Sequence, residues 1–223
     1  MRAWRITAAL GLGVAAVAAL LLTLFPTTGA GYPPGFGEPV FAFEMARSVD
    51  GLQAVFGDLS DPERVARIAS MDRGNLGDLL FMAVYGPFVA SFFVAIHRAG
   101  GSRGWLVFAA LGLFAAACDA VENSILLGLT ADLEGGAGLA VLPVPVWLKF
   151  GALMLCGVAG GVYVAGRGGL WGLLGGSAAV GALAVAAAFT APDQHGWMVG
   201  IGLGIGWLVQ LAYAVRRGWG GAD

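Results

Sequence analysis

Charged side chains are scarce in this chain of 223 residues, and their scarcity decides which class of protein it can be. They make up 12% of the residues, about half of the ~25% found in soluble domains. Hydrophobic residues reach 58%, and the mean hydropathy is +0.81. A water-soluble surface cannot be built from this composition, so the sequence predicts an integral membrane protein.

Basic charge, cysteine and histidine are also in short supply, and each shortage excludes a kind of partner. A net charge of −2 leaves no basic surface for nucleic acid. The two cysteines, Cys118 and Cys156, are expected to be small buried thiols. The chain has only two histidines, His97 and His195, so the sequence predicts no metal site. Nothing in the sequence identifies a cofactor.

Glycine, in contrast, is abundant, with 38 residues that follow no collagen period and lie inside apolar runs. Small residues spaced four apart let membrane helices approach closely. The chain has three such sets, which are Gly157 with Gly161, Gly172 with Gly176, and Gly196 with Gly200 and Gly204. We expect these faces to pack against neighbouring helices, and one of them could pair two copies of the chain in a homodimer.

Six apolar stretches are long enough to cross the ~30 Å hydrocarbon core, which takes ~20 helical residues. They are residues 4–25, 78–96, 105–129, 146–165, 170–190 and 197–215. The sequence therefore predicts an all-α membrane protein, a six-helix transmembrane bundle with an extracytoplasmic segment of amphipathic helices between its first two helices. The predicted parts are a first transmembrane helix (1–25), the extracytoplasmic segment (26–77), a five-helix transmembrane bundle (78–217) and a cytoplasmic tail (218–223).

The first stretch has an alternative interpretation as a signal peptide. The opening MRAWR is basic, and Thr28-Gly29-Ala30 resembles a loose cleavage site. The apolar run between them is longer than the core of a typical signal peptide. We therefore expect a retained helix that acts as an uncleaved signal anchor.

Arginines in the short loops predict the orientation of the bundle. If six helices alternate, the same side receives Arg2, Arg5, Arg98, Arg103, Arg167, Arg216 and Arg217. The opposite short loops carry Asp132, Glu134 and Asp193 without a lysine or arginine. Because basic loops stay in the cytoplasm, the sequence predicts a bacterial inner-membrane protein with both termini cytoplasmic.

The extracytoplasmic segment contains two helical patterns. In FAFEMARSVDGLQAVF, apolar residues recur at helical spacing and predict one amphipathic helix, with Glu44, Arg47 and Asp50 off its apolar stripe. A second helix is expected to start at Asp61-Pro62, which reads as an N-cap followed by proline at the first helical position. These helices could cover the bundle as a lid or could only pack on its outer surface.

The third apolar stretch carries Asp119, Glu122 and Asn123 within CDAVENSILL. A charge near the bilayer centre costs at least ~2.5–3.5 kcal/mol on insertion scales, so such groups need partners or a task. At 100° per residue the three side chains share one face of a helix. This cluster is the main candidate for a functional site, and Asp119 and Glu122 are its candidate catalytic residues.

Polar residues on two other stretches are expected to join this face. Asp78 and Tyr85 share a stripe on the second stretch, and Lys149, the only lysine of the chain, lies on the fourth. Counting along the helices at 1.5 Å per residue brings Lys149 within reach of Glu122 and leaves Asp119 deeper than Lys149 comfortably reaches. The predicted ligand- or proton-handling residues are Asp78, Tyr85, Asp119, Glu122, Asn123 and Lys149.

The predicted site carries more acid than base. Its three carboxyls, Asp78, Asp119 and Glu122, have only the Lys149 ammonium as a counter-charge. In low dielectric this excess requires a protonated carboxyl, a bound cation or an arginine from the extracytoplasmic segment, and the expected arginine is Arg73. A purely structural alternative is a buried pair of Glu122 and Lys149, with Asn123 holding two helices in register.

Four short elements, read in order, carry a resemblance. They are FAFEMARS, GDLLFMAVYG, DAVENSILL and WLKF. The chain resembles an uncharacterised group of bacterial multi-pass membrane proteins with F-E-x-A, D-x-x-F-x-x-x-Y and D-x-x-E-N elements and a lysine-bearing helix, over residues 41–150. The resemblance implies a membrane location and marks the same polar positions, but it implies no reaction.

These observations favour a protein that binds a small or amphiphilic ligand, such as a lipid, in an outer-half cavity lined by intramembrane carboxylates. Transport is one version of this hypothesis, although the last two stretches show few inward polar residues, which counts against a pump. A first alternative is a lipid-modifying enzyme that uses Glu122 or Asp119 as general acid or base. A second is a structural or accessory membrane subunit.

Overall fold

In the computed structural model, which describes residues 1–220, every regular element is a helix. Six helices are long and apolar enough to cross a membrane, as predicted. They are α1 (Arg2–Leu24), α4 (Arg64–Arg98), α5 (Trp105–Ala131), α6 (Pro143–Ala165), α7 (Gly169–Thr190) and α9 (Trp197–Trp219). The short elements are η1 (Pro34–Phe36), α2 (Pro39–Glu44), α3 (Val49–Phe56) and α8 (Pro192–His195).

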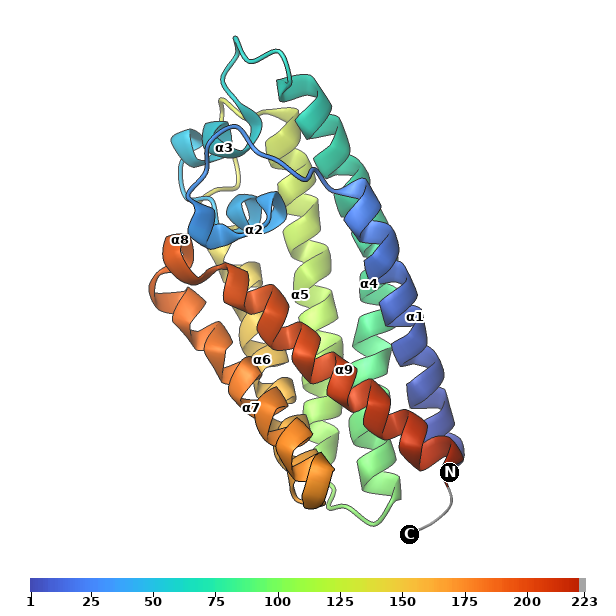
Figure 1. The fold of residues 1–223 in the computed structure, drawn as a ribbon. Coiled ribbons are helices and arrows are strands. Elements are labelled where there is room, and N and C mark those ends of the chain that lie inside the picture. Colours follow the sequence, from blue (N-terminus) through green and yellow to red (C-terminus); the bar gives the residue numbers. More distant parts are fainter. Residues whose placement is uncertain (221–223) are drawn as a thin grey trace.

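The six long helices form a closed ring in which each packs on the next along the chain. α1 packs on α4, α4 on α5, α5 on α6, and α6 on α7. α9 closes the ring between α7 and α1 and also touches α6, because it crosses the bundle obliquely (Figure 1). The short connections from α4 to α5 and from α6 to α7 make those helices neighbours, whereas α1 packs on α4 although residues 25–63 separate them.

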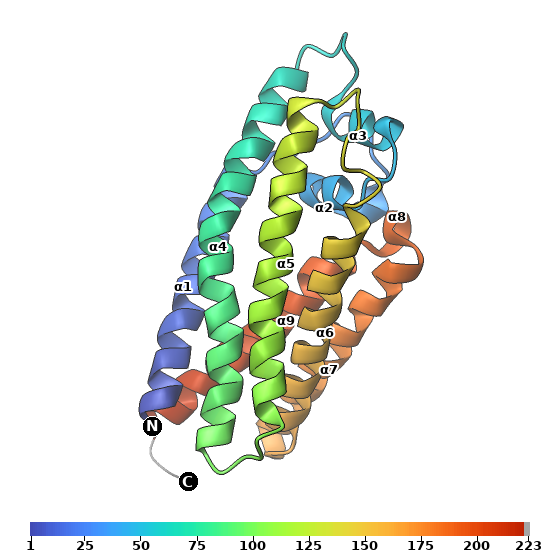
Figure 2. The ribbon, with the colours of Figure 1, turned by 180° about the vertical axis from the view of Figure 1, so that it is seen from behind.

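The two ends of the bundle differ. One end, called the cap end here, holds η1, α2, α3 and α8, together with the connection from α5 to α6 (Figures 1 and 2). The other end, called the termini end, holds the start of α1, the end of α9 and the connections from α4 to α5 and from α6 to α7 (Figure 1). The predicted set of loop arginines therefore gathers at the termini end.

The FAFEMARSVDGLQAVF segment does not form the single helix expected from its apolar spacing. It forms α2 and α3, because Ser48 adopts an extended backbone and caps α3, its Oγ accepting a hydrogen bond from Gly51 N at 3.1 Å. The two short helices lie one above the other at the cap end (Figure 1). The break changes the direction of the chain, and Glu44 is buried instead of facing away from the protein.

The second transmembrane stretch and the helix expected before it are one continuous helix. α4 has 35 residues, about 50 Å at 1.5 Å per residue, so it extends roughly 20 Å beyond a ~30 Å hydrocarbon core. It begins at Arg64, three residues after the expected N-cap. Asp61 instead closes the preceding turn, its Oδ1 accepting a hydrogen bond from Glu63 N at 2.8 Å.

Glycines set the closest helix contacts, although not at every predicted position. A Cβ on Gly157 would lie 2.7 Å from Ala182 Cβ, and one on Gly161 would lie 2.6 Å from Ala179 N, so both face α7 directly. Gly176 and Gly204 have open space where a Cβ would stand. The Gly157 and Gly161 face thus packs as expected, whereas Gly176 and Gly204 contribute no close contact.

This difference gives a matched pair of substitutions. Gly161→Ala should destabilise the protein by ~1–3 kcal/mol, because the added methyl group pushes α6 away from the α7 backbone. Gly176→Ala should be neutral or stabilising by up to ~1 kcal/mol, because alanine favours the helix and meets no neighbour there. Chemical unfolding in detergent measures both, and equal effects would contradict the packing described for α6 and α7.

Candidate functional site

Lys149 is the centre of the buried polar site. It lies on α6 with only 4% of its surface exposed. Its Nζ stands 2.8 Å from Glu122 Oε1, 3.1 Å from Asp119 Oδ1 and 3.4 Å from Glu44 Oε1. We call these four residues the acid cluster. Three helices, α2, α5 and α6, therefore meet at a single ammonium group.

The expectation that Asp119 lies beyond the reach of Lys149 is wrong. Asp119 and Glu122 are three residues apart on one face of α5, and the lysine side chain ends between their two carboxyls. Counting depth along separate helices neglected the length of the side chain. The ring of Phe150 completes the surroundings, with its centroid 4.4 Å from Nζ, a distance suited to a cation–π contact.

Glu44 is the member of the acid cluster that the sequence did not predict. It comes from α2 at the cap end, and its Oε2 is buried without a hydrogen-bond partner. The apolar spacing predicts one helix that continues across Ser48, and on such a helix Glu44 lies off the apolar stripe. Two signals could have found it: Ser48 as the start of a new helix, and the F-E-x-A element, which places a glutamate among apolar neighbours.

Burial governs the ionisation of Glu44. It raises the pKa of this carboxyl above its ordinary value of 4.5, because loss of water disfavours the charged form more than the Lys149 ammonium favours it. The nearby charge of Asp119 acts in the same direction as burial. Protonation of Glu44 is therefore easier in the folded protein than in the unfolded chain.

Tyr85 connects the acid cluster to α4 and α9. Its hydroxyl donates a hydrogen bond to Asp119 Oδ2 at 2.9 Å, and its ring is 1% exposed. Trp207 on α9 stacks on this ring, with centroids 5.4 Å apart and an interplanar angle of 23°. The tyrosine is therefore held in position from one side and bonded to the cluster from the other, as its predicted place in the site requires.

Asp78 and Asn123 form a second polar contact beside the cluster. Asn123 Nδ2 donates to Asp78 Oδ2 at 2.7 Å and joins α5 to α4. Asn123 is 2% exposed, whereas Asp78 is only partly buried. The six predicted site residues thus fall into two groups, with Tyr85, Asp119, Glu122 and Lys149 in contact with one another and Asp78 paired with Asn123 nearer the cap end.

The arginine expected from the extracytoplasmic segment does not pair with the acid cluster. Arg73 is exposed and forms no ion pair among the described residues 1–220. Arg47 lies nearer, where its Nη1 donates to the carbonyl oxygens of Ala46 at 2.7 Å and Glu44 at 3.3 Å. Arg47 is exposed at its surface, and partial loss of water lowers the pKa of its guanidinium, while the charge of Glu122 acts in the opposite direction.

The charges of the site do not balance. Three carboxyls face one ammonium, and Oε2 of Glu44 and Oε2 of Glu122 are both buried without a hydrogen-bond donor. Uncompensated charge in such surroundings is expensive, so the arrangement favours at least one bound proton or cation. The described residues contain no group of three or more histidine, cysteine or carboxylate side chains arranged to hold a metal ion, and both cysteines are buried free thiols.

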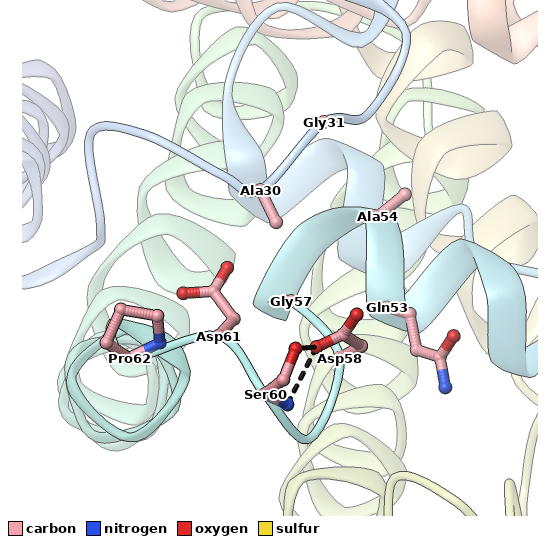
Figure 3. A pocket seen from close by; sticks show the side chains of 9 residues that line it. All are labelled: Ala30, Gly31, Gln53, Ala54, Gly57, Asp58, Ser60, Asp61 and Pro62. Atoms are coloured by element: carbon pink, nitrogen blue, oxygen red, sulfur yellow. Dashed lines mark hydrogen bonds between the residues drawn. The ribbon is translucent and has the colours of Figure 1, made fainter.

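A hollow of about 500 Å³ opens at the cap end, away from the acid cluster. Figure 3 shows the residues around it, which come from α3, from the turn before α4 and from the segment after α1. Asp58 lies at its edge and accepts hydrogen bonds from the Ser60 backbone and hydroxyl at 2.7 and 2.6 Å. The hollow is lined by none of the predicted site residues, and the acid cluster itself is covered by side chains.

The raised pKa of Glu44 predicts how stability depends on pH. The stability that this group contributes is fully present below its ordinary pKa of 4.5 and is lost as pH rises toward its pKa in the folded state. Glu44→Gln imitates the protonated form. The unfolding free energy of this variant minus that of the wild type should therefore rise above pH 4.5, with a slope of up to ~1.4 kcal/mol per pH unit.

Chemical unfolding in detergent between pH 4 and pH 8 measures this difference. Glu38→Gln is the matched control, because Glu38 is an exposed glutamate on the same segment. If this difference stays constant across the range, or falls with pH, burial does not raise the pKa of Glu44.

Comparisons with protein families, with curated proteins and with solved structures found no match to this chain. The resemblance to a group of bacterial membrane proteins therefore stays a prediction, and the function has to be argued from the geometry of the acid cluster.

Proposed function

We propose that the acid cluster binds and releases a proton or a small cation, and that this exchange accompanies binding of a small or amphiphilic ligand in the cap half of the bundle. The observation that carries the proposal is the convergence of Glu44, Asp119 and Glu122 on Lys149, with two buried carboxylate oxygens that receive no hydrogen bond from a donor group. A fully compensated ion pair would hold helices together equally well with one acid. The additional acids favour a site that changes its charge state.

The proposed orientation places the cap end outside a bacterial inner membrane and both termini in the cytoplasm. The loop arginines support it, because they gather at the termini end together with the start of α1 and the end of α9 (Figure 1). The cluster then lies in the outer half of the membrane. Glu44 enters it from the extracytoplasmic side, where protons, ions and ligands are available.

α2 has the role of a cover in this proposal. The helix has only six residues and is connected on both sides by segments without regular helical structure, and in this proposal it shifts as a small unit at the cap end. Displacement of α2 would withdraw Glu44 and expose Lys149, Asp119 and Glu122 to the cap end. A ligand with a polar head group and an apolar body would fit that opening, because the surrounding helices are apolar.

The enzyme and structural alternatives are less well supported. Asp119 and Glu122 are 5% and 1% exposed, so a reacting lipid could touch neither carboxyl while α2 is in place. A purely structural cluster would not need Glu44, whose carboxyl adds negative charge to a site that already has an excess. We therefore place proton or cation binding ahead of catalysis and ahead of a scaffolding role.

Infrared difference spectroscopy tests the proposal. The wild type should show the carbonyl band of a buried protonated carboxyl, and this band should change with pH or with added Na⁺. Asp119→Asn should alter the band and abolish any ligand detected by native mass spectrometry, while the unfolding free energy falls by less than ~1.5 kcal/mol, since the amide has the same size and still forms hydrogen bonds.

Asp50→Asn is the control, because Asp50 is exposed on α3 and should leave both measurements unchanged. The proposal would fail if the cluster showed no protonated carboxyl at any pH and no response to Na⁺. It would also fail if Asp119→Asn lost stability and ligand binding in parallel, because parallel losses indicate a scaffold.

A further inference from the structure

Two unpartnered polar atoms lie on opposite sides of the acid cluster along the bundle. Asn75 Nδ2 is on α4 toward the cap end, and Gln210 Oε1 is on α9 toward the termini end. Both residues are 1% exposed. Most buried polar groups have a partner, either in the protein or in ordered water, so each of these atoms needs an explanation.

Polar groups continue from Asn75 to the cluster along one face of α4. Asn75, Asp78 and Tyr85 are three and seven residues apart, which places them on the same side of the helix. Asp78 accepts a hydrogen bond from Asn123, and Tyr85 donates one to Asp119. The face therefore carries hydrogen-bonding groups in the cap half, at Asn75 and Asp78, and again at the cluster, at Tyr85, with the apolar Phe81 and Met82 between them.

Residues with polar groups continue from the cluster toward the termini end along α9. We call Trp207, Gln210 and Tyr213 the α9 series. Trp207 stacks on Tyr85, and Gln210 follows one turn later, about 4.5 Å further along the helix axis. Gly160 on α6 makes room for its amide, since a Cβ there would lie 2.6 Å from Gln210 Nε2. A glycine at this position keeps the amide in the middle of the bundle.

The α9 series reaches the termini end through two tyrosines. Tyr213 comes three residues after Gln210 and is 3% exposed, and its ring centroid is 5.9 Å from that of Tyr163. The guanidinium of Arg167 lies over the Tyr163 ring at 4.3 Å. Arg167 is exposed in the connection from α6 to α7. The expectation that the last two helices carry few inward polar residues therefore overlooked Gln210 and Tyr213 on α9.

We infer that these residues form a transmembrane proton route through the acid cluster, with ordered water at Asn75 and at Gln210 bridging the series on either side. The inference rests on the proposed function of the cluster and extends it to passage from one side of the membrane to the other. Each carboxyl, hydroxyl or water on the route accepts a proton from one neighbour and donates one to the next. After one passage every group is restored, and one proton has crossed.

The geometry fits a proton better than a larger ion. The route is filled by packed side chains, including Phe92, whose fully buried ring lies beside Gly160 as the Gln210 amide does. A hydrated ion would need an open pore, whereas a proton passes along hydrogen bonds without displacing the groups that carry it. Intramembrane chains of carboxyls and hydrogen-bonding groups are a recurrent means of proton relay.

Proton flux into liposomes tests the route. The purified protein is reconstituted with a pH-sensitive dye inside the vesicles, and a K⁺ gradient with valinomycin imposes an inside-negative potential. Wild-type vesicles should acidify faster than protein-free vesicles. Gln210→Leu should lower the protein-dependent rate at least about tenfold, because the apolar side chain removes the anchor for the water.

Thr7→Val is the matched control, because Thr7 is fully buried on α1 but its hydroxyl bonds to Ala3 O of the same helix. It should conduct within about twofold of the wild type, a difference of less than ~0.5 kcal/mol in the barrier. Gln210→Met, which keeps the length of the side chain, serves in place of Gln210→Leu if that variant does not fold.

Two results would overturn the route. One is a wild-type rate equal to that of protein-free vesicles, and the other is an unchanged rate in Gln210→Leu or Gln210→Met. Either result leaves the proposed function intact as long as the infrared band of the cluster still responds to pH or Na⁺. If the infrared band does not respond to pH or Na⁺, the proposed function is wrong as well.

Discussion

The buried Lys149 ammonium is the constraint on which the rest of the structure depends. An unpaired ammonium at this depth would cost several kcal/mol, so its carboxylate neighbours have to stay in place. Those neighbours come from α5 and from α2, whose Glu44 is the only one supplied from outside the six-helix ring. The position of the cap is therefore linked to the charge of the core.

Tyr85 connects the acid cluster to two further helices, α4 and α9. Its hydroxyl fixes one oxygen of Asp119, and its ring is held by Trp207, so α4 and α9 share the surroundings of the cluster. A change in the protonation of one carboxyl would alter contacts on five helices. In the proposed function, this connection links the charge of the cluster to α2 at one end and to the α9 series at the other.

The fold followed from the sequence more closely than the site did. Long apolar runs separated by polar breaks identified the six spans, and helical periodicity placed Asp119 and Glu122 on one face, because both features depend on local sequence alone. Glu44 was assigned to the wrong side, because the helical break at Ser48 was read through. Gln210 was overlooked because its neighbours are apolar, although an amide in such a helix is itself a signal. The contact between Glu44 and Lys149 depends on how α2 packs against α6, which local sequence patterns do not encode.

The most direct test of the central claim is a double-mutant cycle between Lys149 and Glu122 in detergent. Lys149→Met alone should cost on the order of 3–5 kcal/mol, because it leaves buried carboxyls without their counter-charge. Combination with Glu122→Gln should recover a large part of that loss, with a coupling energy in the range of ~0.5–3 kcal/mol expected for residues in one network. Additive losses would show that the two side chains do not interact, and the account of the acid cluster would be wrong.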